Sequence, residues 1–168
     1  YIINITSKST IGLNKTKTPF IFEKICNENN IPCKYFDDPC TYPKAQKNSI
    51  ELEGAKKANI RDGVSVTKFL YWLKNEMNIS ETDEMKAAKY LFDLRKGNDL
   101  FYSLSFNTIS ALGKHAALPH YQVTKETNLP FKKDTIYLFD SGAQYRDGTT
   151  DITRTIIIGK ATKEHKDR

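Results

Sequence analysis

The sequence predicts an α+β fold in which two helices pack on an antiparallel sheet. Two segments with helical spacing of apolar residues come first, and three segments with strand-like patterns follow. A chain whose helices and strands are segregated typically forms an antiparallel sheet with helices on one face. With 168 residues, 39% of them hydrophobic and 27% charged, the chain is long enough to bury a core of ordinary domain size.

Residues 1–43 are rich in Asn, Lys and Thr and contain one plausible helix, at residues 19–30, and one short strand, at residues 33–36. The sequence DDPCTYP follows, and its two prolines interrupt regular structure. We therefore place a domain boundary there. Residues 1–43 would then belong to one domain and residues 44–168 to another.

The first helix of the second domain is predicted from apolar residues that recur at helical spacing. This apolar stripe consists of Ala55, Val66, Phe69, Leu70, Leu73 and Met77. Gly54 and Gly63 fall within the same segment, and each costs roughly 1 kcal/mol relative to Ala in a helix. Because such a helix depends on packing for its stability, we expect it to lie against the sheet.

A second helix is indicated at residues 80–97. Ser80 or Thr82 is the expected N-cap, acidic residues occupy the first turn, and the helix stops near Gly97. Its apolar face consists of Met85, Ala88, Leu91 and Phe92.

After the second helix the apolar pattern changes to the two-residue period of β-strands. Residues 101–110 predict one strand, because apolar side chains at 102, 104 and 106 alternate with serines. Residues 134–140 predict a second strand and residues 150–159 a third. The last residues, 161–168, are typical of the start of a helix.

Two acidic residues, Asp140 and Asp151, stand in segments that otherwise read as buried strands. An unpaired carboxylate in an apolar setting is costly, so it must be protonated, ion-paired or bound to a cation. Carboxylate oxygens suit hard divalent cations, and two carboxylates on neighbouring strands would form half of a two-metal site. The structural alternative is a salt bridge from Arg146 or Arg154.

The connection between these two acids decides whether they can meet. A two-residue Asp-Gly turn beginning at Asp147 would place Asp151 opposite Gln144. The acids would then lie about four residues apart along the strand, or about 13 Å, which is too far to share a metal pair. We therefore predict a wider or bulged connection at residues 143–149, in which Asp147 has only the ordinary role of a turn residue.

Charge and cysteine content argue against several classes of function. The net charge of +6 comes from 21 Lys against 5 Arg, and the lysines are scattered, which favours a solvated surface over a nucleic-acid interface. No apolar run approaches the roughly 18 residues of a membrane span, and the first residues have no signal-peptide pattern. Cys26, Cys33 and Cys40 match no zinc or disulfide spacing, so we expect free thiols in a reducing, cytoplasmic compartment. Both ends look internal, as in a piece of a longer chain.

The segment YLFDSGAQYRDGTTDITRT, at residues 137–155, resembles the metal-binding hairpin of the Xaa-Pro aminopeptidases, or aminopeptidase P, among the pita-bread metallopeptidases. Residues 47–73 are similar to the first catalytic-domain helix of that family, and residues 104–110 to the strand before its substrate-binding histidine. The combination of D-S-G, D-G-T-T-D and T-R-T separates this group from methionine aminopeptidases.

The resemblance covers roughly residues 44–160 and implies a domain assignment. Residues 44–168 would be the first half of a pita-bread catalytic domain, with two helices on an antiparallel sheet. Residues 1–43 would be the tail of the non-catalytic domain that precedes it in the long members of the family.

The resemblance also implies a set of metal ligands. Asp140 and Asp151 match the first two of five ligands, with Asp151 bridging two divalent ions, most simply Mn²⁺, and Asp140 chelating one of them. The remaining His and two Glu have no counterpart in this chain. Thr153 and Arg154 match residues that support the ligating carboxylates by hydrogen bonds.

One histidine is implied to contact the substrate. His120, in the sequence ALPHYQ, matches the family histidine that stabilises the tetrahedral intermediate, and Tyr121 after it favours His120 over His115. The implied activity is release of the N-terminal residue from peptides with proline in the second position, by a cytoplasmic homodimer with no nucleic-acid or membrane partner. The alternatives are a prolidase-type dipeptidase, a catalytically inactive pita-bread binding protein and, from the charge alone, a nucleic-acid-binding protein.

Overall fold

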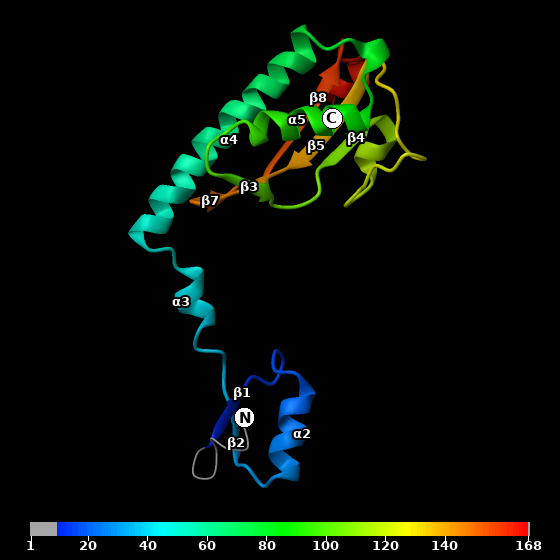
Figure 1. The fold of residues 1–168 in the computed structure, drawn as a ribbon. Helices are drawn as coiled ribbons and strands as arrows, with labels where there is room; N and C mark the ends of the chain where they lie inside the picture. Colours follow the sequence, from blue (N-terminus) through cyan, green and yellow to red (C-terminus); the bar gives the residue numbers. More distant parts are fainter. Residues whose placement is uncertain (1–9, 168) are drawn as a thin grey trace. The chain divides into compact units, whose positions relative to one another are not determined.

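The computed structural model of this chain describes residues 10–167 and confirms the α+β fold class (Figure 1). The chain divides into two compact units, residues 1–47 and residues 48–168. No described helix is long and apolar enough to cross a membrane.

The N-terminal unit contains a small parallel β-α-β arrangement. Strand β1 (Ile11–Leu13) pairs with β2 (Cys33–Tyr35), and helix α2 (Phe20–Glu28) connects them. The predicted helix and strand of this region are therefore confirmed. A short helix, α3 (Thr41–Ala45), spans the predicted boundary after residue 43, and residues 1–9 of the predicted first domain lie outside the described residues. The assignment of residues 1–43 to a separate domain stays a prediction.

Helix α4 (Ser49–Asn75) is the long first helix of the second unit, and its start is fixed by a capping box. The Asn48 side chain accepts a hydrogen bond from the Glu51 backbone nitrogen at 2.9 Å, and the Glu51 carboxylate accepts one from the Asn48 backbone nitrogen at 2.8 Å. Of the predicted stripe, Val66, Phe69 and Leu73 are buried, Ala55 and Leu70 are half-buried, and Met77 lies beyond the end of the helix. This face also contains a buried acid, Asp62.

Helix α5 (Glu84–Lys96) ends at Gly97 as predicted, but its N-cap is Asp83 rather than Ser80 or Thr82. The Asp83 carboxylate accepts a hydrogen bond from the Lys86 backbone nitrogen at 2.8 Å. The Thr82 hydroxyl instead donates to the Asn78 carbonyl oxygen at 2.8 Å. Ser80 belongs to the preceding short helix η1 (Ile79–Glu81).

Six strands of this unit form two small antiparallel sheets. One sheet has the order β4-β5-β8, with strands Ile109–Leu112, Thr135–Ser141 and Ile152–Ile158. The other has the order β3-β6-β7, with strands Phe101–Leu104, Ala143–Tyr145 and Gly148–Thr149. The strands predicted at 134–140 and 150–159 are thus confirmed as β5 and β8, and the short helix α6 (Lys163–Asp167) follows β8.

The prediction of one strand over residues 101–110 was wrong, because the segment crosses from one sheet to the other. Strand β3 ends at Leu104 and β4 begins at Ile109. Between them, the backbone nitrogen of Ser105 donates to the Gly142 carbonyl oxygen at 3.2 Å, and its hydroxyl donates to the Thr150 carbonyl oxygen at 2.9 Å. These bonds hold the segment between β3 and β4 against the part of the hairpin that passes from the β4-β5-β8 sheet to the β3-β6-β7 sheet.

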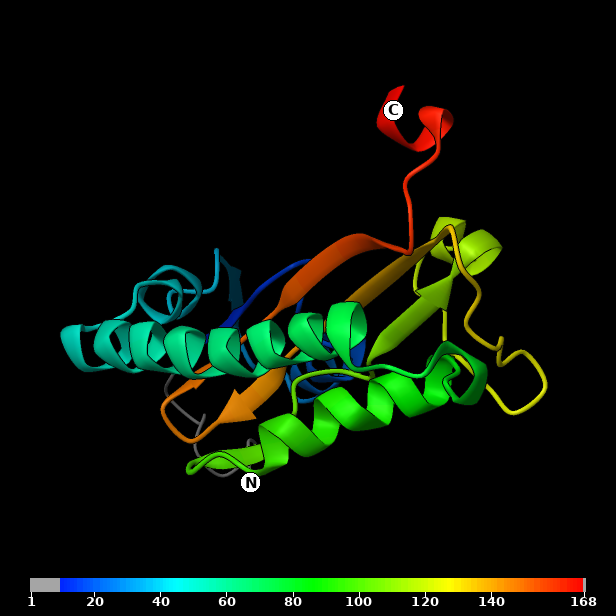
Figure 2. The same ribbon diagram turned by 90° about the horizontal axis from the view of Figure 1, so that it is seen from above.

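The core of this unit lies between the two long helices and the β4-β5-β8 sheet. Figure 2 shows α4 and α5 on one face of the strands. Phe69 of α4 meets Phe139 of β5 edge to face, with ring centroids 5.0 Å apart, and Leu91 of α5 is buried in the same cluster. This packing buries Tyr137, Phe139 and Ser141 on one face of β5, whereas Ile136, Leu138 and Asp140 on the opposite face are only half-buried.

Candidate functional site

The site is built on the hairpin that joins β5 to β8. Asp140 pairs with Thr153 in the β5–β8 ladder. Near the tip, Tyr145 pairs with Gly148, so that two residues, 146 and 147, form the turn. The predicted wide or bulged connection was wrong, since the turn is tight but begins one residue earlier than the Asp-Gly turn that we considered.

This register brings the two acids much closer than an Asp-Gly turn would. Ser141 pairs with Ile152, and the Thr150 backbone nitrogen donates to the Ala143 carbonyl oxygen at 2.9 Å, which leaves Asp151 opposite residue 142. Asp151 is therefore only two residues from Thr153, the direct partner of Asp140. Diagonal neighbours of this kind share one face of a sheet and lie roughly 7–8 Å apart.

Asp140, Asp151 and His120 line a single pocket of about 460 Å³. The other residues that line it are Phe106, Asn107, Ile109 and Gln122. Two carboxylates, an imidazole and an apolar wall in one hollow form an arrangement suited to holding cations next to a polar substrate.

The carboxylates of this pocket are not engaged by arginine. Asp140 accepts a hydrogen bond from the Thr153 hydroxyl at 2.8 Å. Within residues 10–167, neither Asp140 nor Asp151 forms a salt bridge, so the alternative of an ion pair with Arg146 or Arg154 is not what the structure has. Arg154 donates to the Thr153 carbonyl oxygen at 2.7 Å and reaches neither carboxylate.

His120 sits in a loop and has a left-handed backbone conformation, with φ of 55°. Such a conformation costs a non-glycine residue about 1–3 kcal/mol, so surrounding contacts must enforce it. His115 differs, because it is buried and its Nδ1 lies 2.9 Å from the Glu84 carboxylate. Its ring borders an adjoining pocket, but its side chain is already committed to an internal partner.

Sequence reasoning missed Glu84, which is fully buried at the start of α5. Its carboxylate accepts hydrogen bonds from the backbone nitrogens of Leu112 at 2.7 Å and Leu129 at 3.0 Å, and from the Tyr121 hydroxyl at 3.1 Å. In the sequence it is one of several acids in a helical first turn, a position that acids favour for the helix dipole. No local signal separates it from its exposed neighbours.

A second missed group joins α4, α5 and the hairpin. Asp62 and Arg95, both fully buried, form a two-pronged ion pair with distances of 2.7 and 2.9 Å, and the Tyr145 hydroxyl donates to Asp62 at 2.9 Å. Burial and the bond to Asp62 raise the pKa of Tyr145, which keeps the phenol protonated.

Asp147 does more than the ordinary turn role that we predicted. Its two carboxylate oxygens accept hydrogen bonds from Arg61 of α4, both at 2.9 Å. These bonds hold the pKa of Asp147 below its usual value. The hairpin tip is thereby fastened to the helix.

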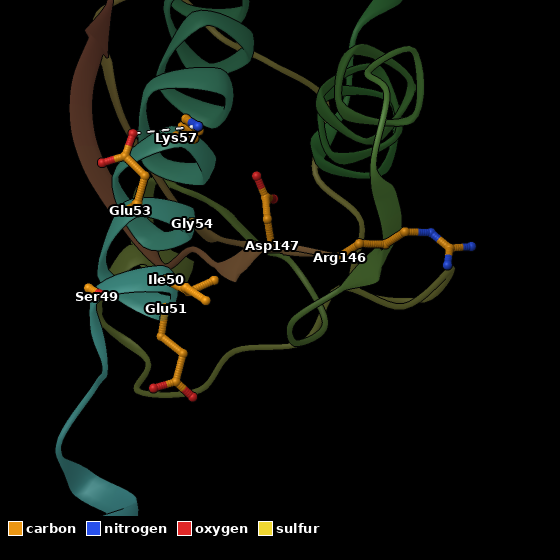
Figure 3. A pocket seen from close by; sticks show the side chains of 8 residues that line it. All are labelled: Ser49, Ile50, Glu51, Glu53, Gly54, Lys57, Arg146 and Asp147. Atoms are coloured by element: carbon orange, nitrogen blue, oxygen red, sulfur yellow. Dashed lines mark ion pairs between the residues drawn. The ribbon is translucent and has the colours of Figure 1, made fainter.

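A pocket of about 590 Å³ lies beside this tip, at the start of α4 (Figure 3). The Glu53–Lys57 ion pair borders it, and the side chain of Arg146 extends away from the helix (Figure 3). Neither Asp140 nor Asp151 lines this pocket, so it is separate from the pocket that holds the two acids.

Over residues 10–167, no cluster of three or more His, Cys, Asp and Glu side chains is arranged to hold a metal ion. The two acids alone are thus an incomplete ligand set.

The sequence pattern of metallopeptidase family M24 matches residues 53–168, which include the whole hairpin. The chain belongs to this family. Xaa-Pro aminopeptidase 2 of Mus musculus is 41% identical over 160 residues, which cover 95% of this chain and 23% of the mouse protein. The resemblance to Xaa-Pro aminopeptidases inferred from residues 137–155 is confirmed.

Solved structures of family members share the fold. The X-prolyl aminopeptidase of Caenorhabditis elegans, described as a cytosolic enzyme with a di-nuclear active site, matches with a TM-score of 0.72 and 38% identity over 79% of this chain and 22% of that protein. The prolidase of Pyrococcus furiosus matches with a TM-score of 0.76 and 25% identity over 99% of this chain and 47% of that protein. This chain therefore spans only about a quarter of the mouse and C. elegans aminopeptidases.

Proposed function

We propose that the full-length protein is a dinuclear metalloaminopeptidase that releases the N-terminal residue from peptides with proline in the second position. The proposal is carried by one observation: Asp140 and Asp151, which form no salt bridge within residues 10–167, share a hairpin face, and both line a pocket with His120. The di-nuclear active site named for the C. elegans relative supports it.

The cations in this proposal are two divalent ions, most simply Mn²⁺, held by Asp140 and Asp151 together with ligands from the remainder of the protein. The residues present fit such ions, since both side chains offer hard oxygen donors, and no arginine within residues 10–167 forms an ion pair with either. When bound, the two metal ions lower the pKa of a water molecule so that it can act as the nucleophile near neutral pH.

The chain's own residues then have distinct tasks. The Thr153 hydroxyl binds Oδ1 of Asp140, which fixes the carboxylate and leaves Oδ2 for a cation. His120, on the wall of the same pocket, donates a hydrogen bond to the oxygen of the scissile carbonyl group as negative charge develops there. Arg154 has no direct role in this scheme, because its contact is to a backbone carbonyl oxygen.

The proposal also places the full-length protein in the cytoplasm and gives it the form of a homodimer. The described cysteines are free thiols, and the C. elegans relative is named a cytosolic enzyme, which supports the compartment. The homodimer rests on the family resemblance alone.

The decisive experiment uses the full-length protein, its metal content and the peptide Arg-Pro-Pro. Asp151→Asn should reduce cation binding and cleavage by more than the roughly 10- to 100-fold that loss of a supporting residue costs. Asp167→Asn, an exposed acid of α6, is the matched control and should leave both unchanged. Full-rate cleavage by chelated protein would exclude the proposed mechanism.

A prolidase-type dipeptidase is the second candidate, because the P. furiosus prolidase shares the fold across nearly the whole chain. A series of Xaa-Pro peptides from two to five residues long separates the two activities. Preference for the dipeptide would favour the prolidase. Metal-loaded protein that cleaves none of the series would favour a catalytically inactive binding protein.

A further inference from the structure

The loop that carries His120 has little regular structure of its own. Apart from the short helix η2 (Gly113–Ala117), residues 113–131 form no helix and no extended strand. His120 nevertheless has a left-handed backbone at φ of 55°, a conformation that L-residues keep only when neighbouring contacts enforce it. The position of this histidine therefore depends on whatever fixes the loop.

The buried carboxylate of Glu84 fixes the loop at both ends and in the middle. It accepts from the Leu112 backbone nitrogen, where the loop leaves β4, and from the Leu129 backbone nitrogen, near its far end, at 2.7 and 3.0 Å. In between, it contacts His115 Nδ1 at 2.9 Å and the Tyr121 hydroxyl at 3.1 Å. A carboxylate has only acceptor sites, so it satisfies all four donors at once.

Two of these partners lie close to His120 in the chain. Tyr121 is the next residue, and its ring stacks on His115 with centroids 4.3 Å apart. The Tyr121 backbone nitrogen donates to the Leu118 carbonyl oxygen at 3.3 Å, which closes a tight turn around His120. With the Tyr121 ring and hydroxyl both fixed, the backbone on one side of His120 has little freedom.

We propose that Glu84 is the positioning residue for His120: by binding Leu112, His115, Tyr121 and Leu129 together, it sets the place of the imidazole relative to Asp140 and Asp151. The proposal rests on the proposed function for the role of His120. Glu84 touches neither substrate nor cation and acts only through the loop.

The test compares Glu84→Gln with a matched loss of another buried carboxylate. Glutamine keeps the size of the side chain but replaces one acceptor oxygen by a donor, which opposes the donors around it. Asp62→Asn removes an equally buried acid that binds Arg95 and Tyr145 and makes no hydrogen bond to residues 113–131. Tyr121→Phe removes only the hydroxyl, which bonds to Glu84 and to Thr127, and keeps the ring, and it serves if Glu84→Gln fails to fold.

A double-mutant cycle in the full-length protein shows whether Glu84 acts through His120. Glu84→Gln should lower kcat for Arg-Pro-Pro by about 10- to 100-fold, with Mn²⁺ content unchanged, as expected for a displaced active-site group. In a His120→Ala background the same change should alter kcat by no more than about twofold. Asp62→Asn should have the same fold effect in both backgrounds, because independent sites are additive.

Amide hydrogen exchange measured by mass spectrometry gives a readout that needs no activity. Glu84→Gln should accelerate exchange across residues 113–131, whereas Asp62→Asn should not. A wild-type protein that fails to cleave the peptide would refute the proposed function, and exchange would still test the anchor. Unchanged exchange in Glu84→Gln, or a full kinetic penalty in the His120→Ala background, would overturn the proposal.

Discussion

Two glycines of α4 provide a stability test of how the hairpin docks on the helix. Gly54 and Gly63 both lie inside α4, and intrinsic propensity treats them alike, at about 0.5–1 kcal/mol of cost each relative to Ala. The structure separates them. A Cβ at Gly54 would lie 2.1 Å from the Asp147 carbonyl oxygen and 3.2 Å from its carbonyl carbon, whereas a Cβ at Gly63 would have nothing within 4 Å.

The magnitudes follow from these contacts. Gly63→Ala should stabilise the protein by about 0.5–1 kcal/mol, since it improves helix propensity without a clash. At Gly54 the same gain is opposed by an overlap of the new Cβ with the backbone carbonyl group of Asp147, and neither of these can rotate away. With an overpacking cost of about 2–3 kcal/mol, Gly54→Ala should be destabilising by about 1–2 kcal/mol overall.

Urea denaturation followed by circular dichroism measures both effects, and the two variants control for each other. The expected order of midpoints is Gly63→Ala, then wild type, then Gly54→Ala. A Gly54→Ala variant as stable as Gly63→Ala would refute the reasoning, because the hairpin tip would then not rest on the helix at this distance.

Three further variants test the polar groups around the site. Because Arg61 lowers the pKa of Asp147, the pair stabilises the fold above about pH 4, and this contribution is lost as the pH falls through the folded pKa. The difference in unfolding free energy between wild type and Asp147→Asn, measured by urea unfolding at a series of pH values, should therefore narrow below that pH. A constant difference would contradict the assignment. Arg95→Met leaves Asp62 buried without its cation and should lower the unfolding free energy by about 3–5 kcal/mol, whereas adding Asp62→Leu should recover most of that loss. Equal losses in the single and the double variant, measured by denaturant unfolding, would show that the ion pair is not the cause. His120→Ala should lower kcat by about 100-fold with the bound metal unchanged, and a parallel loss of metal would assign it a ligand role instead.

Local pattern was enough to predict the helices and three of the strands, β2, β5 and β8. The stripe from Val66 to Leu73 and the stop at Gly97 follow from spacing and from helix-ending chemistry, which act over a few residues. The N-cap of α5 was mispredicted, because Ser80, Thr82 and Asp83 are all good caps by type. The choice depends on which side chain has another partner, and Thr82 binds Asn78.

The remaining features depend on contacts between distant parts of the chain. The segment at 101–110 has one continuous alternation, yet Ser105 binds residues near 142 and 150, and this divides it between two sheets. Glu84 and Asp62 look like ordinary helix-surface acids until the loop and the second helix fold over them. The closeness of Asp140 and Asp151 could be anticipated only as a requirement, because it depends on where a two-residue turn begins.

The continuous pairing of β5 with β8 also has an electrostatic consequence. The ladder pairs Asp140 with Thr153 and ends at the Ser141–Ile152 pair, next to Asp151, so two acidic side chains stand on neighbouring arms of one hairpin, where like charges repel. A cation that settles between them removes this penalty and adds its own binding energy, so the melting temperature should rise with the logarithm of free divalent ion concentration. The hairpin would thereby link the stability of the fold to the supply of the ions that the proposed activity requires.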